Sequence, residues 1–293
     1  MKIAAAAYPL DYFADFAAYA AKLTTWVAEA AGQGAELLVF PEYGAMELGS
    51  LGGRAIAADL EACLHEVARW KPQVDALHKS LAAQHNLYIL GASGPVFLPG
   101  ANRPVNRATF YGPTGILGHQ DKQIMTRFER EIWFVEPGQG LSLFDTPLGK
   151  IGVVICYDSE FPLLSRALVE AGAEILLAPS CTDSFRGFTR VRVGSMARAL
   201  ENQCVVVHSP TVGLCDFCPA VDENVGAAAI YGPPDAGFPD TGIFVQTPLN
   251  QPGWAYADIS LDAIAEVRRN GGVLNHLHWD EQPARVATGV TRC

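Results

Sequence analysis

Short apolar runs alternate with amphipathic stretches along most of the chain. Ile3–Tyr8 and Glu36–Phe40 are short runs dominated by apolar residues, as expected of strands buried in a parallel sheet. Between them, the apolar positions of Ala14–Ala31 recur near the helical period and end at Gly32 and Gly34, which predicts a helix. The chain therefore begins as strand, helix and strand, the order typical of an α/β fold.

The same alternation continues through most of the sequence. Two helices are predicted at Ala57–Trp70 and Gln73–Gln84, separated by Pro72, because proline is poorly tolerated inside a helix. Gly112–Gly115 and Pro147–Lys150 predict two hairpin turns. The other predicted elements are strands at Leu87–Gly91, Asn106–Tyr111, Ile116–Asp121, Ser142–Phe144, Ile151–Cys156, Glu174–Ala178, Cys204–His208, Ala227–Ile230, Ile243–Gln246 and Ala255–Ile259, and helices at Glu160–Ala171, Thr189–Asn202 and Asp262–Asn270.

One segment of the sequence recurs later in the chain. Residues 34–41 are GAELLVFP and residues 172–179 are GAEILLAP, each following a predicted helix. Two interpretations stay open: two ordinary helix–strand junctions that happen to be alike, or a repeated architecture with two similar layered halves. No linker-like run divides the chain, so we expect residues 1–293 to form a single domain with helix-covered sheets. The loop-rich tail from about residue 271 is expected to be a dimer or lid segment.

Composition and charge limit the classes of partner. Of the 293 residues, 49% are hydrophobic, which is enough for a sizeable core and excludes wholesale disorder. The formal net charge of −10 argues against a nucleic-acid partner, since phosphate binding needs clustered Lys and Arg. No apolar run approaches the ~18 residues that span a bilayer, and Pro9 and Asp11 interrupt the N-terminal run, which makes a poor signal peptide. We expect a cytoplasmic protein with no membrane association.

Seven cysteines are scattered along the chain. The odd count argues against a disulfide framework and indicates a reduced protein in which most cysteines, such as Cys63 and Cys204, are small core residues. Cys215 and Cys218 form a lone C-x-x-C. Zinc would need two further ligands, and His208 is the only nearby histidine, so neither a metal site nor a redox function is expected.

Two residues next to predicted strands are candidates for acid–base or electrostatic roles. Glu42 follows a buried strand and Pro41, where desolvation would raise its pKa and make it a general base near neutrality; the alternative is a solvated loop glutamate. Lys122 follows a hairpin strand, with Glu129 seven positions later, and would stabilise negative charge on a carbonyl oxygen if it points into a site. The alternative for Lys122 is again solvation.

Cys156 lies where a strand is predicted to turn sharply into a helix. Asp158 or Ser159 is expected to cap that helix, so Cys156 would face its N-terminus, which favours the reactive thiolate. Backbone N–H groups at such a corner can also bind an oxyanion. The alternative is an ordinary small buried residue at a strand end.

Together, three motifs carry a specific resemblance. F-P-E at residues 40–42, a lysine after a hairpin and G-x-V-I-C-Y-D-x-x-F-P at residues 152–162 occur in the order found in the nitrilase superfamily of carbon–nitrogen hydrolases. The chain resembles that family from its first strand to about residue 259. The resemblance implies a single-domain four-layer α-β-β-α sandwich, homodimers or higher homo-oligomers, and a catalytic triad of Glu42, Lys122 and Cys156. Glu129 resembles an additional glutamate of the family, although Glu131 is a second candidate.

The implied activity is hydrolysis of a non-peptide C–N bond in a small amide or N-carbamoyl compound, through a cysteine thioester and without metal or cofactor. Nitrile-hydrolysing members tend to have Cys-Trp-Glu where this chain has Cys-Tyr-Asp, which favours amides. Nitrile hydrolysis, acyl transfer and a non-catalytic or redox-sensing binding protein on the same fold are the alternatives. Tyr157, Cys181 and Thr182 are expected to bind substrate; Arg186, Arg190 and Arg192 are either carboxylate ligands or solvated side chains.

Overall fold

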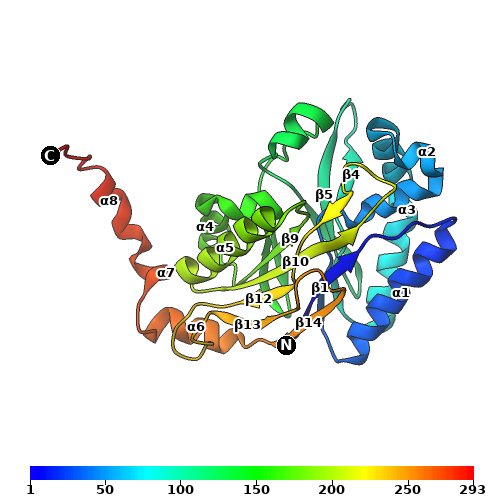
Figure 1. Ribbon diagram of the computed structural model, residues 1–293. Helices are drawn as coiled ribbons and strands as arrows, with labels where there is room; N and C mark the ends of the chain where they lie inside the picture. Colours follow the sequence, from blue (N-terminus) through cyan, green and yellow to red (C-terminus); the bar gives the residue numbers. More distant parts are fainter.

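The computed structural model describes residues 1–293 and contains one curled sheet of fourteen strands that forms two facing layers (Figure 1). The first layer contains β1 (Lys2–Pro9), β2 (Leu37–Val39), β3 (Tyr88–Leu90), β4 (Gly94–Phe97), β5 (Pro104–Gly112), β6 (Gly115–Asp121) and β14 (Gly253–Asp258). The second layer contains β7 (Leu143–Thr146), β8 (Gly149–Val153), β9 (Ile175–Ser180), β10 (Val205–Leu214), β11 (Glu223–Asn224), β12 (Ala229–Tyr231) and β13 (Ile243–Gln246).

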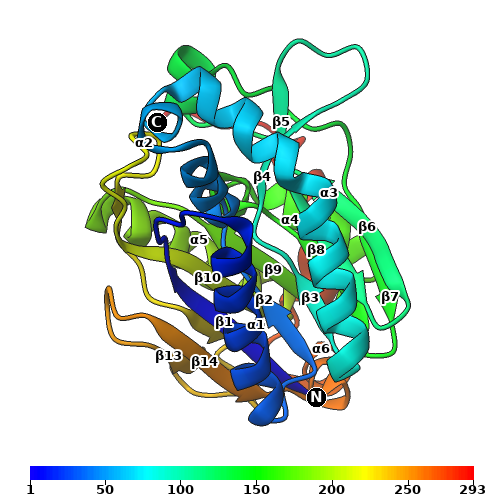
Figure 2. The same cartoon turned by 90° about the vertical axis from the view of Figure 1, so that its right-hand side faces the viewer.

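Helices cover the outer face of each layer. Figure 2 shows α1 and α3 lying over β1, β2 and β3, and Figure 1 shows α4 and α5 on the other side of the molecule. The helices are α1 (Phe16–Gly32), α2 (Arg54–Ala57), α3 (Leu60–His85), α4 (Pro162–Glu170), α5 (Phe185–Asn202), α6 (Leu261–Asn270), α7 (Asn275–His278) and α8 (Gln282–Val286). Three 3₁₀ segments, η1 (Gly44–Gly52), η3 (Cys156–Glu160) and η4 (Trp279–Glu281), and a π-helical turn, η2 (Glu129–Trp133), complete the chain.

The alternation of side chains along each strand builds three apolar cores. In β1, Ile3 packs between the two sheet layers, whereas Ala4 packs under α1 and α3. In β9, Ile175 joins the same central core, whereas Leu176 packs against α4 and α5. Because successive strand residues face opposite sides, a buried strand such as β1 or β9 contributes apolar side chains to two cores. The predicted four-layer α-β-β-α sandwich is confirmed.

The two layers are joined where β1 and β10 run parallel. Their paired residues are Tyr8 with Thr211 and Pro9 with Val212, and the hydroxyl of the buried Ser209 lies 2.8 Å from the carbonyl oxygens of Ala6 and Val39. β2, β3, β8 and β9 run parallel to this pair as well, so the carboxyl ends of all these strands meet at one edge. Ligand sites of α/β sheets collect at such edges.

The repeated sequence occupies equivalent places in the two layers. The backbone N–H of Lys2 donates to the Glu36 side chain at 2.9 Å, and that of Lys150 donates to the Glu174 side chain at 3.0 Å. In both cases the glutamate N–H returns a 2.9 Å bond to the carbonyl of the same lysine. The units β1–α1–β2 and β8–α4–β9 therefore share one local design, which favours the interpretation of two similar halves.

Helix α3 contradicts the predicted break at Pro72. It continues from Leu60 to His85, because Val67 and Val74, seven positions apart, are both buried and keep one apolar face against the sheet. Pro72 itself is exposed and deprives the carbonyl of Ala68 of its helical donor, but Ala68 is partly exposed, so water can replace that donor. The remaining predicted elements are present, most of them with shifted ends, whereas β4, β11 and the short helical segments were not predicted.

The last residues extend away from the body of the molecule (Figure 1). Gln203 anchors the start of this tail by donating to the carbonyl of Val273 at 2.9 Å and accepting from the N–H of His276 at 3.1 Å. The guanidinium of Arg166 lies 4.9 Å from the ring centre of Trp279. The role of the tail as a dimer or lid segment stays a prediction. No helix of the structure is both long enough and apolar enough to cross a membrane.

A close approach of α5 to η3 generates a stability prediction. A Cβ on Gly194 would lie 2.9 Å from the carbonyl oxygen of Ser159, so Gly194→Ala should lower the unfolding free energy by about 1–3 kcal/mol through overpacking. Gly32→Ala is the control, because its Cβ would meet no atom within 4 Å and should raise stability by at most about 1 kcal/mol. Urea unfolding measures both; equal stability of the two variants would contradict this packing.

Candidate active site

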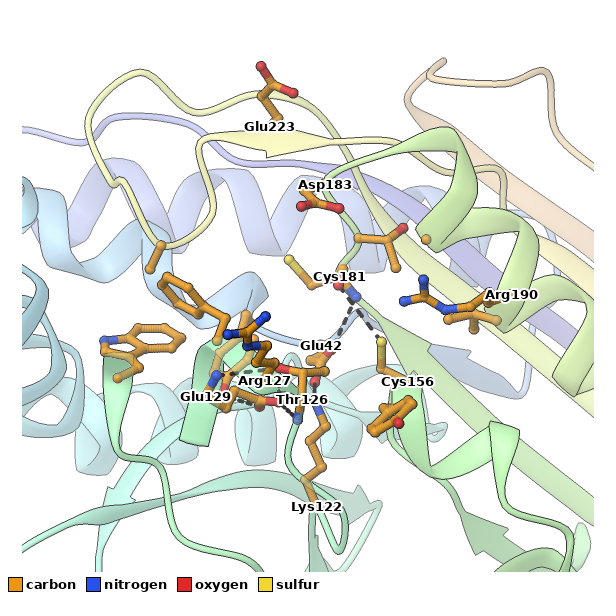
Figure 3. A pocket seen from close by; sticks show the side chains of 18 of the residues that line it. Glu42, Lys122, Thr126, Arg127, Glu129, Cys156, Cys181, Asp183, Arg190 and Glu223 are labelled. Atoms are coloured by element: carbon orange, nitrogen blue, oxygen red, sulfur yellow. Dashed lines mark hydrogen bonds and ion pairs between the residues drawn. The ribbon is translucent and has the colours of Figure 1, made fainter. Parts of the chain in front are cut away.

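A cavity of about 380 Å³ opens at the edge where the parallel strands end (Figure 3). Glu42 follows β2, Lys122 follows β6, Glu129 begins η2 and Cys156 begins η3, and all four side chains lie on the wall of this cavity. The structure thus brings together four residues from four separate segments of the chain.

Glu42 is held by three donors. Its Oε1 accepts from Lys122 Nζ at 2.8 Å and from Asn106 Nδ2 at 3.1 Å, and its Oε2 accepts from the N–H of Cys181 at 2.9 Å. Burial raises the pKa of Glu42 to about 7, against the opposing charge of Lys122. The carboxylate can therefore exchange a proton near neutrality, as expected of a desolvated glutamate at this position.

Lys122 lies between two carboxylates. Its Nζ donates to Glu42 and, at 2.6 Å, to Glu129, whose other oxygen accepts from the Tyr43 hydroxyl at 2.7 Å. Burial alone would lower the pKa of Lys122, but the charges of Glu42 and Glu129 outweigh burial and raise it well above its usual value. Burial likewise opposes ionisation of Glu129, but Lys122 and hydrogen bonds from Thr126 keep its pKa below the ordinary value. Lys122 and Glu129 are therefore both charged.

The geometry separates Glu129 from Glu131. The side chain of Glu129 is 3% exposed and bonded to Lys122, whereas that of Glu131 is 56% exposed and pairs with Arg127 at 2.7 Å. Glu129 is thus the glutamate that faces the Glu42–Lys122 pair.

Cys156 has a left-handed backbone conformation, with φ of 50°, at the start of η3. Its Sγ lies 3.8 Å from the carbonyl oxygen of Cys181. Burial, followed by the charge of Glu42, raises the pKa of the Cys156 thiol well above its usual value. The expectation of a thiolate stabilised by a helix end is therefore wrong, because Cys156 is buried beside a carboxylate and is followed by a single 3₁₀ turn.

Asp158 links the cysteine corner to the lysine segment and does not cap α4. Its Oδ1 accepts from the N–H of Ile124 at 2.8 Å, and its Oδ2 accepts from the N–H groups of Gln123 and Ile155 at 3.1 and 3.2 Å. Helix α4 begins after Phe161 without a side-chain cap. Sequence reasoning missed this bridge, although Asp158 belongs to the motif that identified the corner.

The three predicted substrate residues lie together on the cavity wall, whereas only one of the three arginines joins them. Tyr157, Cys181 and Thr182 line the cavity, and Arg190 points its guanidinium into it while its Nε lies 3.3 Å from Glu160 (Figure 3). Arg186 and Arg192 are not on the wall, and Arg192 donates to Gln246 at 3.2 Å. Sequence reasoning missed several wall residues, which lie in turns or in the short helical segment that ends at Trp133 and whose positions no periodicity indicates: Tyr43, Arg127, Phe128, Trp133 and Asp183.

The other cysteines lie mainly in the cores. Cys63 and Cys204 are buried, as predicted, and Cys215 and Cys218 are buried as well. Cys218 Sγ lies 3.8 Å from Cys63 Sγ, which places one thiol of the C-x-x-C in contact with α3. No group of three or more His, Cys, Asp or Glu side chains is arranged to hold a metal ion.

The sequence of this chain is similar to a known protein family and to several known proteins. The carbon–nitrogen hydrolase family profile matches residues 2–269. Probable hydrolase YhcX of Bacillus subtilis (strain 168) is 31% identical over 274 residues, which are 93% of this chain and 52% of that protein. Nitrilase 2 of Arabidopsis thaliana is 30% identical over 208 residues, which are 67% of this chain and 58% of that protein. The chain spans about half the length of the curated relatives it matches.

A third relative and three solved structures extend the comparison. Deaminated glutathione amidase of Bos taurus is 39% identical over 145 residues, 49% of this chain and 41% of that protein. The carbon–nitrogen hydrolase of Helicobacter pylori G27 superimposes with a TM-score of 0.75 at 18% identity, covering 99% of this chain and 96% of that one. Nit3 of Saccharomyces cerevisiae, of branch 10 of the nitrilase superfamily, gives 0.72 at 19%, covering 92% and 93%.

A mutant amidase from Nesterenkonia sp. AN1, with acrylamide added to its active-site cysteine, gives a TM-score of 0.69 at 21% identity and covers 92% of this chain and 99% of that one. At such identities the structures establish the fold alone, whereas the family profile covers most of the chain. The chain therefore belongs to the carbon–nitrogen hydrolase family.

Proposed function

We propose that this enzyme hydrolyses the C–N bond of a small amide or N-carbamoyl compound, with Cys156 as nucleophile. The observation that carries the proposal is the convergence of Glu42, Lys122 and Cys156 on one wall of a cavity of about 380 Å³. A base with a pKa of about 7 next to a protonated thiol is the arrangement that nucleophilic catalysis by cysteine requires.

The reaction starts with proton transfer from the Cys156 thiol to Glu42. The sulfur attacks the carbonyl carbon, and the carbonyl oxygen becomes an anion bound by Lys122 and the N–H of Tyr157. Lys122 has three N–H donors, of which Glu42 and Glu129 take two, so one is left for this oxygen. Glu129 holds the lysine in place and keeps it charged.

Collapse of the tetrahedral intermediate breaks the C–N bond. Glu42 returns its proton to the nitrogen, which leaves as ammonia or an amine, and Cys156 keeps the acyl group as a thioester. Glu42 then takes a proton from water, which attacks the thioester and releases the acid and the free thiol. Atoms and charges balance without any metal or cofactor.

An amide is preferred to a nitrile because Tyr157 and Asp158 follow the nucleophile, and the similarity to an amidase from Bos taurus supports this choice. The similarity to a plant nitrilase makes nitrile hydrolysis the alternative. A homodimer is also proposed, and the apolar side chains of Leu163, Phe185 and Val193 on α4 and α5, which are 57–72% exposed, provide a candidate face for it. A cytoplasmic location stays a prediction.

Replacement of Cys156 tests the proposed nucleophile. Cys156→Ala should abolish release of ammonia from a panel of small amides, because the thioester cannot form without this sulfur. Cys293→Ala, an exposed thiol outside the site, should retain full activity. Unfolding temperatures verify that both variants fold. Turnover by Cys156→Ala would refute the nucleophile, and hydrolysis of nitriles with no activity on amides would reverse the substrate class.

The pH dependence of kcat/KM reports on Glu42. Below its pKa of about 7 the carboxyl group is protonated and cannot accept the thiol proton, so kcat/KM should fall as pH decreases through 7. Lys122 stays charged into the alkaline range because its pKa is raised, so its deprotonation should cause no loss of activity up to pH ~9. An acid limb centred near 4.5, the ordinary value for glutamate, would contradict the proposed base.

Substitution of Glu129 separates two effects of its charge. That charge raises the pKa of Glu42, so Glu129→Gln should move the acid limb of kcat/KM to lower pH. The plateau should fall by up to about 10²-fold, the usual cost of a ~1 Å misplacement, because Lys122 loses one of its anchors. Glu131→Gln, two positions away and exposed, is the control and should change neither quantity. An acid limb that stays in place in Glu129→Gln would contradict this coupling.

A further inference from the structure

Asn106 lies behind Glu42, outside the cavity wall. It belongs to β5, is fully buried, and pairs in the sheet with Pro95 of β4. Its side-chain amide donates to Glu42 Oε1 at 3.1 Å, on the same oxygen that accepts from Lys122. Asn106 therefore contacts the proposed base without lining the cavity.

The main chain of Asn106 contacts the second member of the triad. Its carbonyl oxygen accepts the backbone N–H of Lys122 at 2.9 Å, where the chain leaves β6. One residue thus fixes Glu42 through its side chain and Lys122 through its backbone. The two triad members come from loops after different strands, so a shared partner on β5 sets their relative position.

The amide group of Asn106 lowers the stability of the folded protein, so packing alone does not explain why this residue is here. Its Oδ1 is buried and has no hydrogen-bond partner. A buried polar atom without a partner destabilises the folded state, and an apolar side chain of similar volume would avoid that penalty. The favourable contact that Asn106 gains in return is the bond to Glu42.

We propose that Asn106 is a positioning residue that holds the Glu42 carboxylate in the orientation and charge state needed to accept the Cys156 proton. This proposal rests on the proposed function for the identity of the reaction. Lys122 binds Glu42 at 2.8 Å but also binds Glu129 at 2.6 Å, so its position is set by both carboxylates and not by Glu42 alone. A neutral amide binds only one carboxylate and adds no charge to the site.

The expected signature is a change in the protonation of Glu42. The titratable groups that face Glu42 are Lys122 after β6, Glu129 and Tyr43 next to it, Cys156 on η3 and Cys181 after β9. All of them persist when only Asn106 is replaced. Loss of a hydrogen bond to the ionised form raises the pKa of a carboxyl group, so proton transfer from Cys156 should require a higher pH.

The experiment compares Asn106→Leu with Asn202→Leu. Asn202 is the matched control: it is equally buried, its Oδ1 also lacks a partner, and its amide donates only to Arg198 and Glu201 on α5, away from the cavity. The rate of N-ethylmaleimide addition to Cys156 is followed against pH by peptide mass spectrometry. The midpoint of this profile should rise by about one pH unit in Asn106→Leu, because a hydrogen bond to a charged group is worth about that much.

Amide turnover provides a second measurement. At pH 7, kcat of Asn106→Leu should fall about fivefold with KM unchanged, because a pKa that rises by one unit from about 7 leaves about a tenth of Glu42 ionised instead of half, and kcat should recover at higher pH as Glu42 ionises. Asn202→Leu should keep the wild-type midpoint and kcat even if its unfolding temperature drops. A wild-type profile in Asn106→Leu, or an equal shift in both variants, overturns the proposal.

A second variant and a measurement without substrate cover a failure of Asn106→Leu to fold and a lack of amide hydrolysis. If Asn106→Leu does not fold, Asn106→Asp replaces it; this variant preserves the shape, and its charge next to Glu42 should raise the midpoint at least as far. A midpoint that does not rise in Asn106→Asp overturns the proposal. Because N-ethylmaleimide addition requires no substrate, the profile still tests Asn106 if the wild type hydrolyses no amide, an outcome that refutes only the proposed function.

Discussion

A single buried ammonium group shared by two carboxylates determines how this site is built. Lys122, Glu42 and Glu129 are each at most 3% exposed, and when Glu42 is ionised they together place a net charge of −1 inside the protein. Burying ions costs several kcal/mol each unless their hydrogen-bonding groups are satisfied. Here the two carboxylates accept further hydrogen bonds from four places, namely the Asn106 amide, the Cys181 N–H, the Tyr43 hydroxyl and the Thr126 segment.

This electrostatic requirement explains why the strands must end where they do. The donors come from β5, from the loop after β9 and from the segments next to β2 and β6, so none can shift by a residue without leaving a charge unsatisfied. Asp158 ties the nucleophile to the same cluster, because its carboxylate accepts from the N–H of Ile155, next to Cys156, and from the N–H of Ile124, next to the Lys122 segment. The cores provide the stability of the layers, and the charged cluster sets their register at this edge.

Prediction from the sequence succeeded where one local signal sufficed. Glu42 and Cys156 follow apolar runs closed by proline or by the C-Y-D corner, and those runs are strands β2 and β8. The protonation of Cys156 could not be predicted, because it depends on Glu42, which is distant in sequence. The predicted helix break at Pro72 was wrong because it also depends on distant residues: burial of Val67 and Val74 against the sheet overrides the local helix breaker. Asn106 gave no signal, since a strand residue with one polar side chain is common.

The seam between β1 and β10 has a mechanical consequence. The proposed base follows a strand of the first layer and the nucleophile follows a strand of the second, so neither half of the chain contains a complete reaction centre. Two residue pairs and the Ser209 hydroxyl tie the layers at the edge that carries the cavity. The seam therefore lies directly beside the chemistry, so the backbone pairing that joins the two layers also sets how far apart the base and the nucleophile lie.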